Sequence, residues 1–539
     1  SKPEESTKSP SVSLECADSM KQTLNDSILR RGTRSAARLE TARRFRVRSA
    51  ATIVLVAAVF TGPHVNAQDS AYLEWVRQEQ LKFERFRNAQ DSAFSGMLDR
   101  TWIEVRGVGE EPLHRRKKIE RPPVYGSVPT SPAPSSSVWE PAAPREVPRT
   151  PAPDPSPGAP AAASVRGPVS DAPSAGLAFF GTPIPYRADP SWKALRPPVD
   201  LNDQGIREWW IKASATAYEP MIEEIRRQAG RAGLNDWGFV RLAWETGRTV
   251  SAGDRTTLPL FTWFVLIQSG KDARIAYNRT GLHLLVSVQE KLYAKEYFQF
   301  DQKRYYVVDF DGSPGRLGSI RTYEGQHAVA SADVSMAMTQ VPLLSGRGFE
   351  HRVLRFSYEG VPIEFPVRVR KPRIDYFGEY PQTELEIFFN TPLPAELRED
   401  IGLGLAPHLA GRSQTESVNV LLRFVQTAFD YATDEEQFSK EKHLIPEEMV
   451  WHPYSDCEDR SFLFARLAKE LLGLEVIGLH YPGHVATAVR LEAVEPGGDV
   501  VRHEGVLYSV ADPTYMHADV GVEMPRYKGS ERRVVRIDS

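Results

Sequence analysis

The stretch from residue 107 to residue 197 limits what this chain can fold into more than any other feature of the sequence. It holds repeated Pro-Ala-Pro, Ser-Pro and Thr-Pro pieces and few large apolar side chains. Such a composition cannot bury enough apolar surface to offset the entropy lost on ordering the backbone. We therefore expect a disordered, proline-rich linker over 107–197 that separates two foldable parts of the chain.

The parts on either side of this linker differ in kind. Residues 68–106 are rich in charge and their apolar positions follow helical spacing, which predicts a helical segment. Beyond residue 198 the chain is too long for one core, so we expect a multi-domain α+β protein. The patterns divide it into 198–315, a β-rich module at 316–400, and a further domain at 401–539. The formal net charge of −3 gives no sign of a nucleic-acid partner.

Residues 1–67 have the features of a leader with a signal peptide. Arg43 and Arg44 precede an apolar run at 49–60, and a small-x-small cleavage site ends at Ala67. We therefore expect an exported protein of the periplasm or cell envelope. The apolar run is short for a bilayer span, so membrane contact would come only from this segment if it stayed uncleaved.

The chain has two cysteines, and cleavage of the signal would remove Cys16 and leave Cys457 as the single thiol. Such a protein has no internal disulfide, and a thiol outside the cytosol is prone to oxidation. A buried, inert cysteine is the ordinary interpretation. The residues around Cys457 favour a different one, in which the thiol is kept because it reacts.

Cys457 stands at the start of a predicted helix. Ser455 or Asp456 is a good N-cap, an apolar face runs from 462 to 472, and Gly473 ends the helix. Backbone N–H groups and the helix dipole at this end stabilise a thiolate, which lowers the pKa of a thiol placed there. The sequence therefore predicts an activated nucleophile.

Two further residues complete a candidate catalytic triad. His484 follows a Pro-Gly turn and opens a predicted strand, and Asp512 ends another predicted strand. A cysteine on a helix, with histidine and aspartate on neighbouring strands, supplies a nucleophile, a base and a group that orients the base. Each residue also has an ordinary interpretation, since histidines are common on surfaces and Asp512-Pro513 is a turn signal.

Around this triad a set of short motifs occurs in order: Val418-Asn419, Phe429-Asp-Tyr431, Asp434, Pro446-Glu447 and Asp456-Cys-Glu-Asp459. With them, residues 418–515 resemble the transglutaminase-like superfamily, and in particular the bacterial transglutaminase-like cysteine proteinases. The resemblance implies a papain-like fold for 401–539, in which the helix bearing Cys457 packs on an antiparallel sheet. It also implies a thiol mechanism through Cys457, His484 and Asp512, with no cofactor required for the chemistry.

The same resemblance implies calcium, because acidic residues beside the cysteine bind calcium in that proteinase family. In this chain they would be Asp456, Glu458 and Asp459, and clustered carboxylates suit a hard cation. The alternative is that Asp456 and Glu458 only complement the helix dipole. The chain departs from the family at 441–444, where the proteinases have an aromatic-rich stretch, so substrate specificity is not implied.

Residues 198–315 contain a candidate second copy of the same pattern. Residues 258–270 align without gaps on 461–473, and both end in glycine. His283 and the strand after it fall where His484 would, Tyr306–Asp309 resembles Tyr508–Asp512, and Asp254 matches Cys457. This suggests an inactive transglutaminase-like domain. The alternative is two unrelated helix–strand units with similar apolar patterns.

Together these features predict an exported thiol hydrolase, similar to a protease or peptidase, that forms a thioester at Cys457. Its substrates would be proteins or peptides of the cell envelope. Two alternatives stay open. The acyl group could pass to an amine, as in a cross-linking transglutaminase, or the triad could be vestigial in a non-catalytic envelope scaffold.

Overall fold

The computed structural model describes residues 67–113, 119, 121–126, 175–186, 190–312, 315–327, 330–346 and 348–538. The predicted leader and signal peptide at 1–66, with Cys16, lies outside the described residues, as does most of the proline-rich stretch. Among helices of the described residues, none combines the length and the apolar run needed to cross a membrane.

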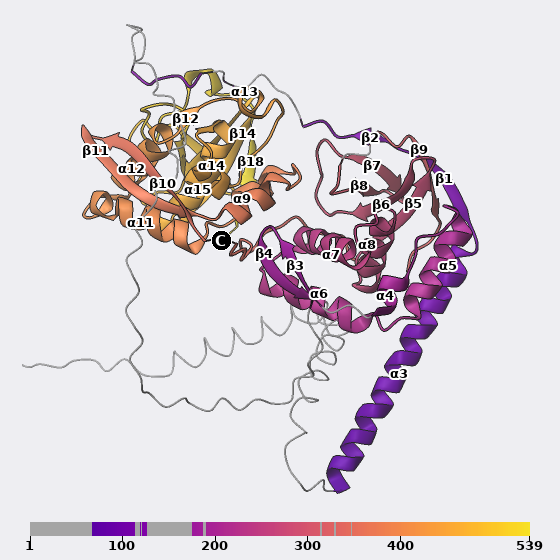
Figure 1. Cartoon of the computed structure of the whole chain (residues 1–539). Helices are drawn as coiled ribbons and strands as arrows, with labels where there is room; N and C mark the ends of the chain where they lie inside the picture. Colours follow the sequence, from indigo (N-terminus) through magenta and orange to yellow (C-terminus); the bar gives the residue numbers. More distant parts are fainter. Residues whose placement is uncertain are drawn as a thin grey trace, which may run out of the picture. The chain divides into compact units, whose positions relative to one another are not determined.

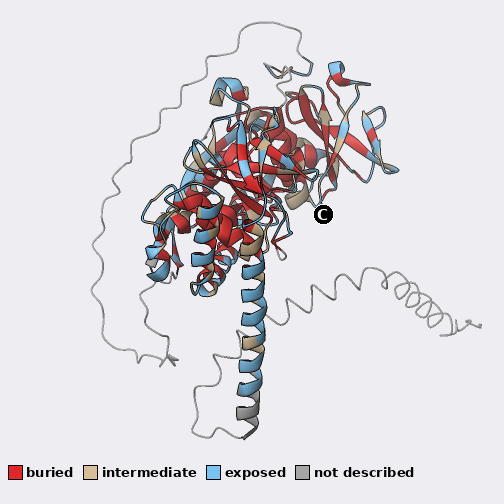
Figure 2. Cartoon of the chain, turned by 90° about the vertical axis from the view of Figure 1, so that its right-hand side faces the viewer, coloured by how far each residue is buried: buried red, intermediate tan, exposed pale blue. Residues whose placement is uncertain are grey.

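The segment predicted to be helical is helix α3 (Ala67–Leu98), followed by strand β1 (Trp102–Arg106). Residues up to 89 form a unit of their own, separate from residues 90–539. In that first unit the large apolar side chains of Trp75, Phe83 and Phe86 are exposed, and Figure 2 shows the exposed face along the helix. The helical prediction therefore holds to residue 98 and is wrong for 102–106, which are extended.

The expectation of a structureless linker over all of 107–197 is also wrong at both ends of the range. Its C-terminal end is ordered because Leu177, Phe179, Ile184 and Trp192 supply apolar residues that become buried. The composition of the whole stretch hid these short apolar patterns. The elements concerned are β2 (Gly109–Glu110), β3 (Ala175–Phe179), β4 (Thr182–Tyr186) and α4 (Pro190–Ala194).

The first part of the compact unit combines four helices with a seven-stranded antiparallel sheet. The strand order is β1-β9-β5-β6-β8-β7-β2, and the nearly all-apolar helix α8 packs on β5 and β6 (Figure 1). The elements are α5 (Asp203–Ser214), α6 (Glu219–Arg231), α7 (Asp236–Val250), α8 (Thr257–Gln268), β5 (Ala273–Asn278), β6 (Gly281–Ser287), β7 (Glu296–Phe300), β8 (Lys303–Val308) and β9 (Ser319–Tyr323).

Residues 316–400 do not form the β-rich module that the alternating pattern predicted. Strand β9 completes the first sheet, and β10 and β11 form a hairpin that packs on helices α11 and α12 of the last part. Phe356 and Phe365 bring the hairpin against Phe424 of α12. The elements are β10 (Glu350–Tyr358), β11 (Val361–Val369), α9 (Lys371–Gly378), α10 (Leu385–Asn390), α11 (Ala395–Leu409) and α12 (Gln414–Thr427).

The last part is built around helix α15 (Cys457–Leu472), whose start and end follow the sequence prediction. Gly473 ends it with a φ of 67°, a left-handed conformation that glycine adopts without strain. The helix packs on β14 (Val476–Tyr481) and β15 (His484–Val489) of a five-stranded antiparallel sheet, order β16-β17-β15-β14-β18. The other strands are β17 (Val506–Ala511), which lies between β15 and β16, and the two edge strands β16 (Val500–His503) and β18 (Arg533–Arg536).

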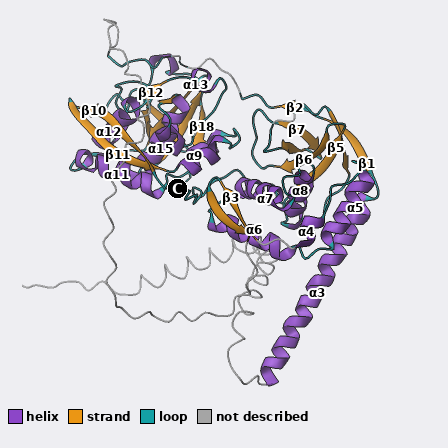
Figure 3. Cartoon of the chain, in the orientation of Figure 1, coloured by secondary structure: helices purple, strands orange, loops and turns teal. Residues whose placement is uncertain are grey.

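The two sheets share one arrangement. Helix α8 followed by β5, β6, β7, β8 and β9 has the same strand order as α15 followed by β14, β15, β16, β17 and β18, and Figure 3 shows both helix–sheet pairs. One offset relates the strand starts, since 476 − 273, 484 − 281 and 506 − 303 all equal 203. The register of the paired strands agrees as well. Leu284 of β6 pairs with Val308 of β8, and the residues 203 positions later, Thr487 of β15 and Ala511 of β17, also pair. Shared order and register support an internal repeat.

These observations establish the coarse part of the predicted fold class. The chain mixes helices with mainly antiparallel sheets, and helix α8 packs on the seven-stranded sheet as helix α15 packs on the five-stranded sheet.

Candidate functional site

Cys457 is the first residue of α15 and is fully buried. The backbone approaches it through the short strand β13 (Tyr454–Ser455), which pairs in parallel with β12 (Asp430–Tyr431). The amide of Asp456 donates to the side chain of Asp459 at 3.3 Å and so closes the start of the helix. The Sγ atom of Cys457 lies 2.9 Å from Oε2 of Glu458.

His484 and Asp512 form a direct, buried pair. Nε2 of His484, the first residue of β15, lies 2.8 Å from Oδ2 of Asp512, which directly follows β17. Oδ1 of Asp512 accepts hydrogen bonds from the backbone amides of Thr514 at 2.9 Å and Tyr515 at 3.2 Å. The second ring nitrogen, Nδ1 of His484, is buried and has no hydrogen-bond partner among the described residues. That nitrogen is therefore available to act as a base.

Two contacts place the thiol and the imidazole at the same end of the helix–sheet pair. Ser461, one turn after Cys457, donates from Oγ to the carbonyl of Val485, the residue after His484, at 2.9 Å. Tyr527 stacks on the imidazole of His484 with ring centroids 4.8 Å apart. Burial raises the pKa of Tyr527 to about 12, with further upward contributions from the charges of Cys457 and Asp512. The hydroxyl of Tyr527 therefore lies close enough to interact electrostatically with Cys457 and with Asp512.

Arg460 is a site residue that the sequence prediction missed. Its guanidinium is buried and donates to the carbonyls of Gln426 at 3.2 Å and Phe429 at 2.8 Å. Burial lowers its pKa to about 10, while the nearby charges of Tyr431 and Asp456 act in the opposite direction. Arg460 is thus the buried counter-charge to the acidic start of α15. An arginine in the first turn, where helix patterning expects apolar or acidic residues, was the available signal.

The acidic residues beside the cysteine separate into two groups. Glu458 contacts the thiol, whereas Asp456 and Asp459 gather with Asp434, so that one carboxylate oxygen from each lies within 4.8 Å of the others. All three residues of this acidic cluster are buried. The predicted calcium ligands Asp456 and Asp459 are therefore brought together, and Asp434 stands where Glu458 was expected.

The chemistry of the acidic cluster fits a hard cation. Its donors are all carboxylate oxygens, the type that calcium prefers. Part of their capacity is used by backbone amides, since Asp459 accepts from Leu444 N at 2.7 Å and Asp434 accepts from Lys442 N at 3.1 Å. Each carboxylate oxygen has a second lone pair, so an oxygen that accepts one of these bonds can still coordinate a metal.

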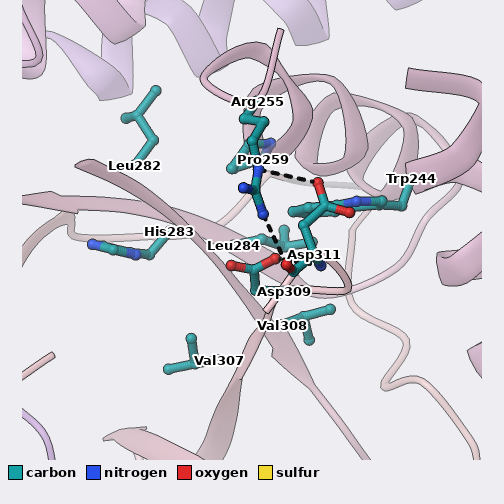
Figure 4. A pocket seen from close by; sticks show the side chains of 10 residues that line it. All are labelled: Trp244, Arg255, Pro259, Leu282, His283, Leu284, Val307, Val308, Asp309 and Asp311. Carbon is teal, nitrogen blue, oxygen red and sulfur yellow. Dashed lines mark hydrogen bonds and ion pairs between the residues drawn. The ribbon is translucent and has the colours of Figure 1, made fainter. Parts of the chain in front are cut away.

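The equivalent place in the first sheet holds a pocket of about 120 Å³ and lacks the thiol chemistry (Figure 4). The offset of 203 residues puts Asp254 in the place of Cys457, Gly281 in the place of His484, and Asp309 in the place of Asp512. The prediction that His283 matches His484 is therefore wrong by two residues along the strand. An aspartate remains, but the nucleophile and the base are both replaced.

The pocket has its own polar contacts. Arg255 donates to the backbone carbonyl of Asp311 at 2.8 Å and lies 3.6 Å from its carboxylate. Nε2 of His283 bonds to Oδ1 of Asn278 at 2.8 Å. Burial lowers the pKa of His283 to about 4, against an opposing contribution from Asp309. The histidine is therefore neutral at physiological pH and serves the packing of this sheet.

Comparison with known proteins found no match for the chain. No family model, no curated protein and no solved structure matches it.

Proposed function

We propose that residues 401–539 form a thiol hydrolase of the transglutaminase-like, papain-like kind, which cleaves amide bonds in proteins or peptides. One observation carries the proposal. Nε2 of His484 lies 2.8 Å from Oδ2 of Asp512, which leaves the buried Nδ1 of His484 without a partner among the described residues. His484 is at the start of β15, next to the helix that begins at Cys457. Nucleophile, base and orienting group thus come from a helix and two adjacent strands.

The reaction would proceed in two steps. In the first, Nδ1 of His484 takes the proton of the Cys457 thiol, and the sulfur attacks the carbonyl carbon of the amide. The C–N bond breaks, the amine leaves with the proton held by His484, and a thioester remains. In the second, water attacks the thioester while His484 takes its proton, releasing the carboxylic acid and restoring the thiol.

Two features of the chain suit these steps. The first amides of a helix lack intrahelical partners, so the start of α15 can donate to the oxyanion of the tetrahedral intermediate. Asp512 holds a proton on Nε2 of His484, because Oδ2 accepts there while Oδ1 is held by two backbone amides. The imidazole is thus kept in the tautomer in which Nδ1 can accept a proton.

In the same proposal, Asp434, Asp456 and Asp459 would hold a calcium ion. The ion would neutralise the buried carboxylates and fix the junction at which Cys457 enters the helix. No chemical step passes through it.

The setting and the substrates are part of the proposal as well. The basic and apolar leader around 43–67 suggests export to the periplasm or cell envelope, where the substrates would be found. Transfer to an amine in place of water is the alternative reaction, since the acceptor depends on access to the thioester and not on the triad. A scaffold with a vestigial triad is the alternative from outside enzymology, and the complete burial of Cys457 is the observation that favours it.

The experiment that tests the proposal compares the full chain with Cys457→Ala and with Cys16→Ala as the matched control. Hydrolysis is followed on a quenched fluorescent peptide library, and transfer on incorporation of a fluorescent primary amine. We expect Cys457→Ala to lose about 10³-fold or more of the hydrolysis, and Cys16→Ala to keep it. Equal turnover in Cys457→Ala would exclude the mechanism, and amine incorporation without hydrolysis would select the transferase.

A further inference from the structure

A short piece of the proline-rich stretch lies on the last part of the chain. The amide of Tyr125 donates to the carbonyl of Met516 at 2.8 Å, and the amide of Met516 donates to the carbonyl of Pro123 at 3.0 Å. Val124 therefore pairs with Met516 in parallel, as an added strand would. We call Ile119 together with residues 121–125 the docked segment; Figure 1 shows it in indigo beside β12.

Side chains hold the docked segment as well. The hydroxyl of Tyr431 donates to the carbonyl of Ile119 at 2.6 Å, although 312 residues separate the two in sequence. Ile119 is only 5% exposed and belongs to the apolar cluster that contains Tyr481, Tyr515 and Tyr527. Tyr125 also packs edge-on against Tyr515, with ring centroids 5.7 Å apart.

The residues that hold this segment are neighbours of the triad. Tyr431 pairs with Ser455, two residues before Cys457. Burial raises the pKa of Tyr431 well above its ordinary value, and the charge of Cys457 adds to this effect.

The other two members of the triad have similar neighbours. Tyr527 stacks on His484, and Tyr481 is nearly parallel to it at 6.1 Å. The amide of Tyr515 donates to Oδ1 of Asp512. The docked segment therefore contacts the surroundings of nucleophile, base and orienting aspartate together.

Resting on the proposed function, we infer that this surface is the substrate-binding site, and that the docked segment occupies it as an internal mimic of the substrate. The substrate class is an extended peptide that adds beside Met516 and places an aliphatic side chain in the apolar cluster now filled by Ile119. In this state the thiol is covered, since Cys457 is 0% and His484 is 1% exposed.

The chemistry of the segment and of the surface agrees with that role. Pro122 and Pro123 favour an extended backbone before binding, which reduces the entropy lost on docking. The hydroxyl of Tyr527 is buried and has no hydrogen-bond partner among the described residues, so it can bond to a substrate backbone. A peptide in place of the segment would find a backbone donor and acceptor at Met516 and a donor at Tyr431.

The test measures how fast iodoacetamide alkylates Cys457 in the full chain, read by mass spectrometry of the peptide that contains it. Ile119→Asp puts a charge in the apolar cluster and should release the segment. Tyr431→Phe removes one hydroxyl and keeps the ring, so it tests the same contact without a large change in packing. Val361→Asp is the matched control, because it introduces the same charge at a valine outside the docked segment, at the start of β11, with 52% of its surface exposed.

We expect Ile119→Asp to be alkylated about tenfold faster than the wild type, Tyr431→Phe a few-fold faster, and Val361→Asp at nearly the wild-type rate. A synthetic peptide with the sequence of residues 119–125 should slow the reaction of Ile119→Asp again, and the same peptide with aspartate for isoleucine should not. Folded variants with unchanged alkylation, or a peptide without effect, would overturn the inference.

The two proposals fail in different ways. If alkylation rises and peptide protection is seen while every variant lacks hydrolysis, the segment covers the thiol and the hydrolase proposal is wrong. If Cys457→Ala abolishes a measurable hydrolysis while Ile119→Asp changes neither alkylation nor turnover, the hydrolase proposal stands and the docked segment is only a packing contact. Selective cleavage of peptides with an aliphatic residue by Ile119→Asp would support both.

Discussion

Asp512 holds His484 with one carboxylate oxygen while two backbone amides hold the other. The first contact is 2.8 Å long, and the amides of Thr514 and Tyr515 approach Oδ1 at 2.9 and 3.2 Å. The carboxylate can therefore rotate little, and the tautomer of the imidazole is determined by the loop after β17.

This arrangement predicts a specific defect for Asp512→Asn. The amide oxygen of the asparagine would stay on the two backbone amides, and its NH₂ group would then face Nε2 of His484. The imidazole would have to carry its proton on Nδ1 and could not accept one from the thiol. We expect turnover to fall by about 10²- to 10⁴-fold with KM little changed, measured as steady-state hydrolysis. Turnover close to the wild type would show that Asp512 does not orient the base.

Arg460→Met should destabilise the last part of the chain strongly. Methionine keeps much of the volume but removes the donors to the carbonyls of Gln426 and Phe429 and the positive charge beside Asp456. Removing a buried charge while its neighbouring charges and acceptors stay in place costs about 3–5 kcal/mol in the free energy of unfolding. Urea denaturation measures it, and Arg466→Met on the same helix, which loses an ion pair to Glu470, is the control. A smaller loss of unfolding free energy in Arg460→Met than in Arg466→Met would contradict the role of Arg460 as the buried counter-charge.

Removal of calcium should weaken the protein if the acidic cluster binds the ion. An ion present at 100 times its dissociation constant stabilises a fold by about 2.7 kcal/mol, so a chelator should lower the melting temperature by several degrees. Asp434→Asn should remove most of the calcium response, whereas Asp99→Asn, with an exposed side chain, should keep it. If a calcium titration gives no heat and Asp434→Asn is more stable than the wild type, the three carboxylates are held without a metal.

The lowered pKa of His283 leads us to expect a loss of stability in mild acid. Its pKa is lowered by burial from 6.5 to about 4, so the unfolded chain binds a proton before the folded one does. The stability that the neutral histidine contributes is present above pH 6.5 and falls as the pH drops towards 4, by about 1.4 kcal/mol per pH unit at most. His283→Gln lacks this titration, so wild type and variant should differ less in unfolding free energy at pH 4 than at pH 7. A difference independent of pH would show that the buried imidazole does not titrate in this range.

Local features of the sequence determined the elements of the site. The N-cap before Cys457, the apolar face of its helix and the ending at Gly473 predicted the bounds of α15, because a helix is defined by hydrogen bonds between residues four apart. The turn before His484 predicted where β15 begins, and the ungapped match of 258–270 to 461–473 pointed to a repeat that shared strand order and register now support. These are short-range patterns, readable without knowledge of the fold.

Tertiary structure alone decided what surrounds the triad. Asp434 joins Asp456 and Asp459, Tyr527 covers His484, and Arg460 becomes a buried cation through contacts with segments about 30 residues away in sequence. The bond from Tyr431 to Ile119 also brings a piece of the proline-rich stretch onto the site. Burial and charge pairing depend on which distant segments meet. Local periodicity does not show which distant segments meet. Composition therefore predicted disorder at places where a few apolar residues in fact pack on a surface of the folded chain.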